Sequence, residues 1–375
     1  MRNTLFAFIA IALGLHFVNA SRFAPAPDAN IHLIAHRGIH QTYSSKDLKR
    51  DDCTATRINS PTHEYLENTI PSMEAAFAAG ADVIELDVAP TTDGQFAVFH
   101  DWTLDCRTEG SGPVRAQSMD ALRKLDIGYG YTADGGKTFP FRGKGIGLMP
   151  SLTEVLNRFP EGQFLVNFKS KDSTEADALA KLLAENPRWR DSIWSVYGGE
   201  IPTNRAHELM PDIMGFTKDG IKSCLKEYIA LGWSGHVPDA CKNTRLMIPS
   251  DYTWLIWGWP NRFQQRMQNN GTTVILTGPL KGYGGIEALQ HPAEVIPDHF
   301  IGYVWTNKIE EIGPILASSP RPDSTVTFNP DLGLPNQEPQ PEFQAPPRVY
   351  CCAPPPIQVP ISTRPDIKAL SDKPQ

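Results

Sequence analysis

The sequence predicts an α/β fold, a single (β/α)8 TIM barrel of parallel strands. Short apolar runs alternate with helical stretches, and reactive polar residues directly follow several of those runs. Eight such runs fit the number of strands that closes a barrel. The expected strands are Ile31–Ala35, Asp82–Val88, Gln163–Phe168, Ser192–Val196, Asp212–Phe216, Arg245–Ile248, Thr272–Leu276 and Ile301–Trp305. The expected helices include Ile70–Ala79, Ser173–Glu185, Gly220–Leu231, Arg262–Asn269 and Ile309–Leu316.

A further expected strand, Gln95–His100, does not belong to this series. The tight-turn sequence Thr92-Asp93-Gly94 joins it to the strand before it. We therefore expect a hairpin at the mouth of the barrel, which brings His100 back towards Asp87.

The first 20 residues have the pattern of a signal peptide. Arg2 precedes the apolar stretch Leu5–Val18, which is short for a membrane span. The stretch is followed by a small residue, Ala20, as at the cleavage site of a signal peptide. An uncleaved N-terminal anchor is the alternative. No later stretch is long and apolar enough for a transmembrane segment. We expect residues 1–20 to be removed, residues 21–319 to form the barrel, and the mature protein to be secreted or periplasmic.

The C-terminal segment 320–375 differs in composition from the barrel. It contains 14 of the 33 prolines and has no periodic apolar pattern. This composition is typical of a disordered tail or linker. The sequence does not identify a partner for it.

Charge and cysteine content narrow the functional class. The formal net charge is −7 and no dense Lys/Arg run occurs, which argues against nucleic-acid binding and against a basic membrane-surface patch.

The six cysteines form no CxxC motif, but export permits disulfides. We expect Cys53–Cys106 to join the long segment after the first strand to the hairpin region, and Cys224–Cys241 to be a second pair. Free thiols are the alternative, and Cys351 and Cys352 receive no role.

Polar residues gather where the barrel strands end, which is where barrel enzymes carry their active sites. Glu85 and Asp87 are two residues apart, so both side chains lie on one face of their strand. Two converging carboxylates repel each other unless a cation lies between them. One divalent ion, Ca²⁺ or Mg²⁺, would satisfy them.

Two histidines and two basic residues complete the group. His36 and His100 are an acid/base pair that can titrate near neutral pH, while Arg37 and Lys169 offer positive charge to an anion. Taken singly, each could be a structural residue: His36 a core histidine, Lys169 a solvated strand end. Together at successive strand ends, they favour displacement at phosphorus in a small-molecule phosphodiester.

These motifs occur in a recognisable order. The runs Ile34–Gly38, Glu67–Ile70, Gly80–Asp87, Thr92–Gly94 with Val98–Asp101, and Pro150–Leu152 with Lys169 resemble the signature of the glycerophosphodiester phosphodiesterase family, within the phosphatidylinositol-phosphodiesterase-like barrel superfamily. The resemblance implies a divalent metal and hydrolysis of glycerophosphodiesters to glycerol phosphate and an alcohol. It implies His36 as general base, His100 as general acid, Glu85 and Asp87 as metal ligands, Arg37 and Lys169 as phosphate contacts, and Glu67 in the metal and substrate shell.

The chain departs from the family pattern in two places. Asn167 lies where the family usually has a third acidic metal ligand, and an amide oxygen can bind the ion but adds no charge. We expect Asn167 to be that ligand and to bind the metal weakly. The segment 39–66 is longer than usual, which affects substrate preference.

Two other functions are consistent with the sequence. A phospholipase-D-like enzyme acting on sphingomyelin or lysophospholipids would need an apolar groove, which Trp254, Trp257 and Trp259 could line. A non-catalytic extracytoplasmic binding protein on the same barrel is the alternative from another class, and Asn167 is its support.

Overall fold

A computed structural model describes residue 6 and residues 13–28, 30–49, 52–280 and 284–316. All structural statements below concern these residues, which fall within one compact unit of the chain. The expected tail at 320–375 lies outside them, as do Cys351 and Cys352.

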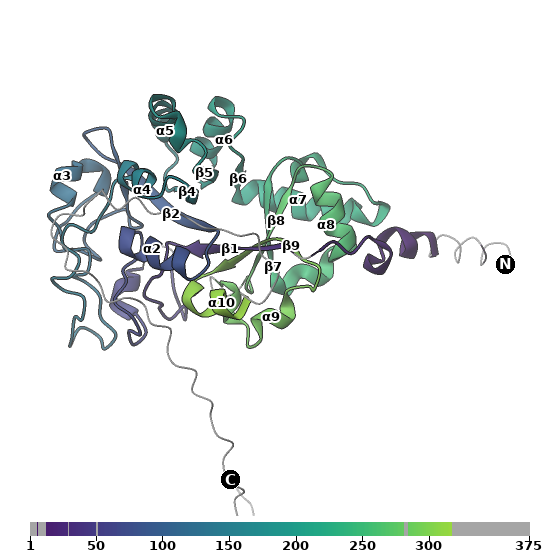
Figure 1. The fold of residues 1–375 in the computed structure, drawn as a ribbon, viewed down its shortest axis with the longest axis horizontal. Helices are drawn as coiled ribbons and strands as arrows, with labels where there is room; N and C mark the ends of the chain where they lie inside the picture. Colours follow the sequence, from purple (N-terminus) through teal and green to yellow (C-terminus); the bar gives the residue numbers. More distant parts are fainter. Residues whose placement is uncertain (1–5, 7–12, 29, 50–51, 281–283, 317–375) are drawn as a thin grey trace, which may run out of the picture. The chain divides into compact units, whose positions relative to one another are not determined.

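Eight parallel strands form a nearly closed barrel, as the sequence predicts (Figure 1). The hydrogen-bonded order is β6-β5-β4-β2-β1-β9-β8-β7, and β6 and β7 approach each other at the two ends of this path. The strands are β1 (Asn30–His36), β2 (Val83–Pro90), β4 (Gln163–Phe168), β5 (Ile193–Gly198), β6 (Gly215–Thr217), β7 (Arg245–Pro249), β8 (Thr273–Thr277) and β9 (Ile301–Thr306).

Helices follow the strands and cover the outside of the barrel (Figure 1). They are α2 (Ile70–Ala78), α3 (Met119–Leu122), α4 (Leu152–Arg158), α5 (Thr174–Glu185), α6 (Glu200–Leu209), α7 (Lys218–Leu231), α8 (Asn261–Gln268), α9 (Pro292–Val295) and α10 (Ile309–Leu316). The five helices expected from the sequence are present within two residues at each end. Strand β6 begins three residues later than expected, because the amide of Ile213 closes a turn onto the carbonyl of Met210 at 2.9 Å.

The expected hairpin is formed by β2 and the short antiparallel strand β3 (Phe96–Val98). The Thr91 amide donates to the Gln95 carbonyl at 2.9 Å, and Gly94 supplies the left-handed conformation of the turn (φ 75°). The Phe99 amide then bonds the Asp87 carbonyl at 3.0 Å. His100 therefore follows directly on a segment tied to the end of β2.

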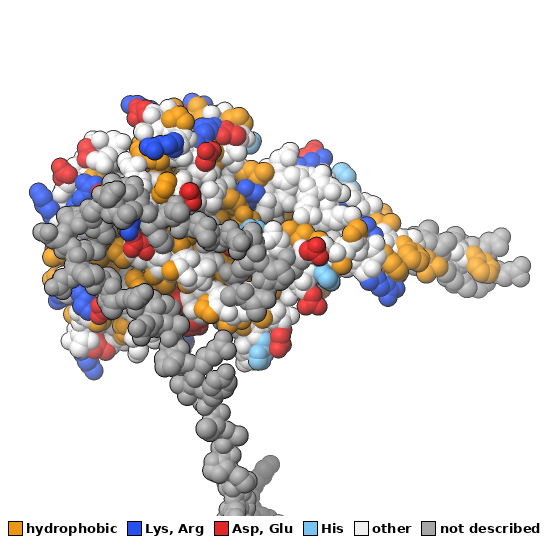
Figure 2. All heavy atoms as spheres, viewed as in Figure 1, with side chains coloured by type: hydrophobic (Ala, Val, Ile, Leu, Met, Phe, Trp, Pro, Cys, Tyr) orange, Lys and Arg blue, Asp and Glu red, His pale blue; other side chains and the backbone are white. Residues whose placement is uncertain are grey.

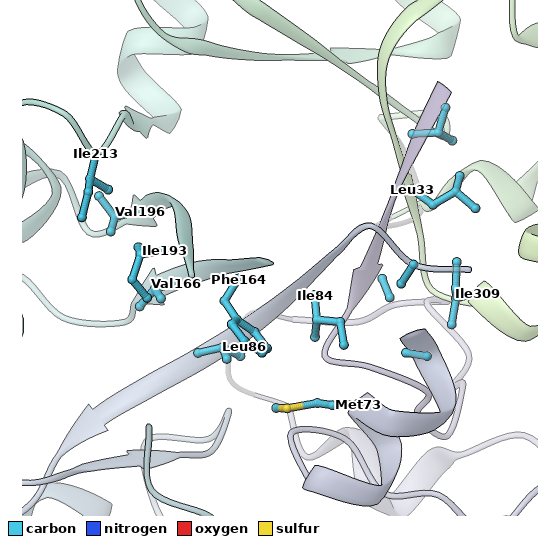
Figure 3. Close-up of a cluster of buried hydrophobic side chains, with 14 of the residues drawn as sticks. Leu33, Met73, Ile84, Leu86, Phe164, Val166, Ile193, Val196, Ile213 and Ile309 are labelled. Atoms are coloured by element: carbon cyan, nitrogen blue, oxygen red, sulfur yellow. The ribbon is translucent and has the colours of Figure 1, made fainter. Parts of the chain in front are cut away.

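Both faces of the barrel strands are buried, which explains their continuous apolar runs. Leu33, Ile84 and Leu86 point outwards and pack under the helices with Met73 of α2 (Figure 3). Alternate residues point into the barrel, where the inner cluster comprises Ile34, Val83, Leu165, Phe216, Ile275 and Trp305. Glu85 and Asp87 share the parity of Val83 and therefore face the barrel interior.

A separate apolar cluster lies outside the barrel layers. It is built from residues of 55–66 and 97–149, including Ala55, Leu104, Leu122 and Phe141. We call it the side core. It gives the long segment after β1 a packed support next to the hairpin.

Residues 13–19 form a helix that ends before β1. Leu13 and Phe17 are more than half exposed, and Figure 2 shows hydrophobic side chains along this helix at the right of the view. Its end touches the barrel, because Arg266 donates to the Val18 carbonyl at 3.0 Å. No helix among the described residues has the length and apolar character needed to cross a bilayer.

Both expected disulfides are present. Cys53 and Cys106 are joined with Cα atoms 5.4 Å apart, and Cys224 and Cys241 with Cα atoms 4.8 Å apart. The first closes a separation of 53 residues and the second a separation of 17. In the chain-entropy model the longer loop gives the larger stabilisation.

Replacing Cys53 and Cys106 together by serine should lower the free energy of unfolding by about 2 to 4 kcal/mol. The matched Cys224→Ser/Cys241→Ser variant should lose about 1 kcal/mol less, because its loop is shorter. Urea unfolding of both variants and the wild type measures this. Equal stability of the Cys53/Cys106 variant and the wild type would contradict the prediction.

Candidate active site

The end of β1 has an unusual backbone. Arg37 is in the left-handed region (φ 59°), as is Asn68 (φ 59°) in the segment before α2. The two are tied together, because the Asn68 amide donates to the Arg37 carbonyl at 3.0 Å while the Arg37 amide donates to the Glu85 carbonyl at 2.9 Å. Such conformations are costly for residues with a side chain and persist where neighbours hold them. They turn the Arg37 side chain across the strand ends.

The next residue, Gly38, is also left-handed (φ 74°) and lies against α2. A Cβ there would lie 2.2 Å from Oγ of Ser72, which itself donates to the Arg37 carbonyl. Helix α2 begins at this point, where Oγ1 of Thr69 accepts from the Ser72 amide and caps the helix. Glycine is therefore required for α2 to approach β1 closely.

Glu85 and Asp87 lie side by side in the barrel interior and are fully buried. Asp87 is surrounded by donors. Nε of Arg37 is 3.2 Å and Nζ of Lys169 is 3.3 Å from its carboxylate oxygens. Asn68 and Asn167 donate to it through their amide nitrogens at 3.1 and 2.9 Å.

Glu85 has fewer partners. It accepts from the Tyr197 hydroxyl at 2.6 Å through Oε1, while Oε2 is buried without a hydrogen-bond partner. Burial and the neighbouring charge of Asp87 raise its pKa. Burial would also raise the pKa of Asp87, but Lys169 and Arg37 outweigh it and hold that pKa well below its ordinary value. The pair thus carries uneven charge, and Glu85 is the member that lacks a cation.

His36 has a defined tautomer. Its Nδ1 is 2.6 Å from Oδ1 of Asn307, whose Nδ2 donates to Glu287 at 2.7 Å. The amide of Asn307 is thereby oriented with its oxygen towards the ring, so Nδ1 carries the proton and Nε2 offers a lone pair. Burial and the charge of Arg37 lower the pKa of His36 well below its ordinary value. These features suit a proton acceptor.

His100 is oriented by a carboxylate. Its Nδ1 is 2.6 Å from Oδ1 of Asp101, and Nε of Arg107 donates to Oδ2 of Asp101 at 2.9 Å. Burial and the charge of Arg37 lower the pKa of His100. A bound phosphate anion opposes that effect, because negative charge favours the imidazolium form. Nε2 of His100 is the nitrogen left for exchange with a substrate.

Glu67 connects the two halves of the site. Its Oε1 accepts from Arg37 and its Oε2 from Arg107, each at 3.0 Å. Burial would raise the pKa of Glu67, but the charges of Arg107 and Arg37 outweigh it and lower the pKa. Glu67 is therefore an anion held between two guanidinium groups.

The structure brings the sequence-predicted residues together, but three further polar residues join them. Tyr197, Asn307 and Arg107 were not anticipated. Asn307 directly follows β9, so the rule that placed the others at strand ends could have found it. Tyr197 directly follows the expected strand Ser192–Val196, so the same rule could have found it. Arg107 has no comparable sequence signal, because only the folded chain places it beside Glu67.

Asn167 lies beside the carboxylates, in register with Asp87. Its Nδ2 donates to Asp87 at 2.9 Å and to Glu85 at 3.3 Å, so the amide nitrogen faces the carboxylates. In the described ranges, no three His, Cys, Asp or Glu side chains are grouped so as to hold a metal ion. The pair itself still suits a divalent ion, because Oε2 of Glu85 is buried, anionic when ionised and without a hydrogen-bond partner.

A small pocket beside His100 is lined by both apolar and charged side chains, among them Phe99, Trp102, Val114, Arg115 and Lys169. Trp254 is 79% exposed, and Trp259 packs on the barrel core. The tryptophans at 254–259 therefore do not line an enclosed groove.

Comparison with known proteins supports a family assignment. Residues 36–195 match the model of the Glycerophosphoryl diester phosphodiesterase family. The chain is 41% identical over 105 residues to a glycerophosphodiester phosphodiesterase of Caldanaerobacter subterraneus subsp. tengcongensis, covering 28% of this chain and 40% of that protein. It is 38% identical over 111 residues to one of Bacillus subtilis, covering 28% and 36%. The chain thus aligns with less than half the length of these relatives.

Solved structures show the same fold over a longer stretch. The glycerophosphoryl diester phosphodiesterase domain of an uncharacterized Mycobacterium tuberculosis protein has a TM-score of 0.53 at 16% identity, covering 76% of this chain and 99% of that one. A putative enzyme of this name from Silicibacter pomeroyi has a TM-score of 0.50 at 16% identity, covering 81% and 98%. At these identities the likeness establishes the barrel alone.

Gly38→Ala should destabilise the protein more than Gly94→Ala. Both glycines have nearly the same φ (74° and 75°), but a Cβ at Gly94 meets no atom within 4 Å. Gly94→Ala should therefore cost only the left-handed strain, about 1 kcal/mol. Gly38→Ala adds overlap with Ser72 and should cost about 1 to 3 kcal/mol more. Thermal unfolding compares them, and equal losses would contradict the close approach of α2.

Proposed function

We propose that this chain is a glycerophosphoryl diester phosphodiesterase, the family whose model matches residues 36–195, and that it hydrolyses glycerophosphodiesters to glycerol phosphate and an alcohol. One observation carries the proposal. Two histidines, each with Nδ1 fixed by an acceptor, lie beside the buried carboxylate pair. Nε2 of His36 is 3.8 Å from Glu85, and His100 lines a pocket with Lys169, which pairs with Asp87 at 3.3 Å. His36 can act as a neutral base, and His100 is oriented by the carboxylate of Asp101. With the charges of Arg37 and Lys169 close by, this arrangement suits cleavage of a phosphodiester.

His36 is the proposed general base. Its Nε2 accepts the proton of a glycerol hydroxyl or a water, whose oxygen forms the new bond to phosphorus. Asn307 holds Nδ1 in its protonated form at 2.6 Å, which leaves Nε2 available. When the ring becomes an imidazolium, the carboxylate of Glu85, 3.8 Å from Nε2, stabilises the charge.

Arg37 and Lys169 are the proposed phosphate contacts. In the structure both pair with Asp87, at 3.2 and 3.3 Å, so their charges are already gathered at one point. A guanidinium offers a planar pair of donors and an ammonium a compact charge, and both stabilise the negative charge that develops on phosphate oxygens.

His100 is the proposed general acid. It gives its Nε2 proton to the leaving oxygen as the phosphorus–oxygen bond to the alcohol breaks. Asp101 keeps the ring oriented through Nδ1 and supports the protonated form. If a water attacks, glycerol phosphate forms directly, His36 gives the proton it accepted to solvent, and His100 takes one back from solvent. If the glycerol hydroxyl attacks, a cyclic phosphate forms first. A water that gives its proton to His100 then opens this ring, while His36 returns its proton to the glycerol oxygen.

We also propose a metal requirement. Glu85 and Asp87 would hold a Ca²⁺ or Mg²⁺ ion, with Glu67 nearby. Asn167 would join them through its amide oxygen after its side-chain amide turns over, because Nδ2 faces the carboxylates in this structure. Such an ion would supply additional positive charge to the phosphate oxygens when bound. The support is the buried Oε2 of Glu85, which has no hydrogen-bond partner. Because Asn167 is neutral, we expect weaker binding than with three carboxylates.

An extracytoplasmic location is part of the proposal. The two disulfides are compatible with an oxidising compartment, where such bonds persist. The signal peptide at residues 1–20 remains a prediction from the sequence. Measuring the mature N-terminus of the exported protein would test it.

His36→Ala and His100→Ala should each lower kcat about 100- to 10,000-fold, the usual contribution of a positioned acid or base. The measurement is steady-state hydrolysis of a soluble glycerophosphodiester, with circular dichroism to check the fold. His207→Ala, on the exposed side of α6, is the matched control and should retain activity. Near wild-type turnover in either site variant would contradict the assignment. Turnover confined to vesicle-bound lysophospholipid would instead support the lipid-directed alternative.

Asn167→Glu should tighten divalent-ion binding, because it adds a third negative charge beside Glu85 and Asp87. Titration calorimetry with Ca²⁺ and Mg²⁺ after chelation gives the affinity directly, and activity against metal concentration gives a second readout. Asn204→Glu, on exposed α6, adds the same charge elsewhere and should leave the affinity unchanged. Full activity in chelated wild type would refute the metal requirement. Equal affinities of wild type and Asn167→Glu would exclude residue 167 as a ligand.

A further inference from the structure

We propose that Arg107 is a positioning residue that orients the general acid His100 through Asp101 and the phosphate contact Arg37 through Glu67. The inference rests on the proposed function and concerns the same site. Arg107 lies neither at a strand end nor beside the reacting phosphate. It acts on both through two carboxylates.

Arg107 is almost completely buried, with 2% of its surface exposed. A guanidinium is taken out of water at a high cost unless its donors are satisfied and its charge is paired. Here every nitrogen has a partner. Nε bonds Asp101 at 2.9 Å, Nη1 bonds Glu67 at 3.0 Å and also the Tyr131 hydroxyl, and Nη2 bonds Thr54 at 2.7 Å. The group is therefore held rigidly.

The contact with Asp101 determines the orientation of His100. Asp101 has one oxygen on Nδ1 of His100 and the other on Nε of Arg107. A carboxylate bound on one side only could rotate about its bond to Cβ, and the imidazole could turn with it. Burial would raise the pKa of Asp101, but the charge of Arg107 and the hydrogen bond from His100 outweigh it. Asp101 thus stays ionised and fixed.

The contact with Glu67 determines the position of Arg37 in the same way. Each oxygen of Glu67 accepts from a different guanidinium, one from Arg37 and one from Arg107. Because Glu67 is tethered on its far side, Arg37 is held towards Asp87 and the phosphate position. The planar fork of arginine reaches Asp101 and Glu67 at the same time, which a lysine ammonium does with poorer geometry.

The anchor of Arg107 lies in the long segment after β1. Thr54, which accepts from Nη2, belongs to the 3-10 helix η2 (Thr54–Arg57) at the start of the side core. The disulfide Cys53–Cys106 joins the residues immediately preceding Thr54 and Arg107. The long segment 39–66 therefore supplies the hydrogen-bond partner of Nη2 of Arg107. This gives it a role in catalysis besides any effect on substrate preference.

The test compares two leaving groups. An alkyl alcohol needs a proton from His100 to depart, whereas a p-nitrophenolate departs without one. Arg107→Lys keeps the positive charge but removes the planar guanidinium, whose nitrogens bond Asp101 and Glu67 together. It should lower kcat about 10- to 100-fold for a glycerophosphodiester with an alkyl leaving group, but no more than about 3-fold for the p-nitrophenyl substrate. Loss of the tether on Arg37 should raise KM for both substrates.

Controls separate this role from a general loss of structure. Tyr131→Phe removes one bond of the same guanidinium but neither carboxylate contact, so the alkyl-to-aryl ratio of kcat should be unchanged. Asp101→Asn should reproduce the selective loss for the alkyl substrate. The double variant Asp101→Asn/Arg107→Lys should add little to the single ones, because both act through one relay.

The outcomes are distinct. Equal losses of kcat for both substrates in Arg107→Lys, or additive losses in the double variant, would overturn the positioning role. If Arg107→Lys does not fold, Thr54→Val tests the same anchor. Nη2 then loses its partner Thr54, whereas Nη1 still bonds Glu67 in Tyr131→Phe. Thr54→Val should therefore shift the alkyl-to-aryl ratio, and an unchanged ratio would also overturn the positioning role. Wild type that hydrolyses neither substrate refutes the proposed function, and this inference with it.

Discussion

The burial of two carboxylates on one face of β2 is the constraint on which the site depends. Glu85 and Asp87 lie inside the barrel, where charge is costly without compensation. Many of the surrounding polar side chains offset that cost by pairing with the two carboxylates. Arg37 accepts a left-handed backbone to reach Asp87, and Lys169 reaches the same carboxylate from β4. The cations that pair with Asp87 are the ones proposed to bind a phosphate.

The two carboxylates are not stabilised equally by their neighbours. Asp87 has two cations, whereas Glu85 has a tyrosine hydroxyl and one oxygen without a partner. A divalent ion would remove that inequality, and Asn167 in place of a carboxylate reduces the attraction for it. The proposed metal ligand Asp87 is also the carboxylate that pairs with both proposed phosphate contacts, Arg37 and Lys169.

A second support lies outside the barrel. The side core and the disulfide Cys53–Cys106 hold Arg107 next to Glu67 and Asp101. The barrel supplies His36 from β1, and the hairpin supplies His100 from β3. The two histidines therefore lie on different parts of the molecule. The chain of ion pairs through Glu67 connects Arg37, the neighbour of His36 in the chain, with Arg107 and Asp101 beside His100. The side core therefore supports the contacts that orient His100.

The sequence by itself determined the barrel, the hairpin and most of the site. Strand parity placed Glu85 and Asp87 on one face, and position after a strand identified His36 and Lys169, because such local rules depend on neighbours in the chain. Tertiary structure alone decided which charges pair. Arg107 is 40 residues from Glu67, and Tyr197 is 112 residues from Glu85. No local periodicity encodes contacts at those separations. They arise when the closed barrel and the packed side core bring distant segments into hydrogen-bonding distance.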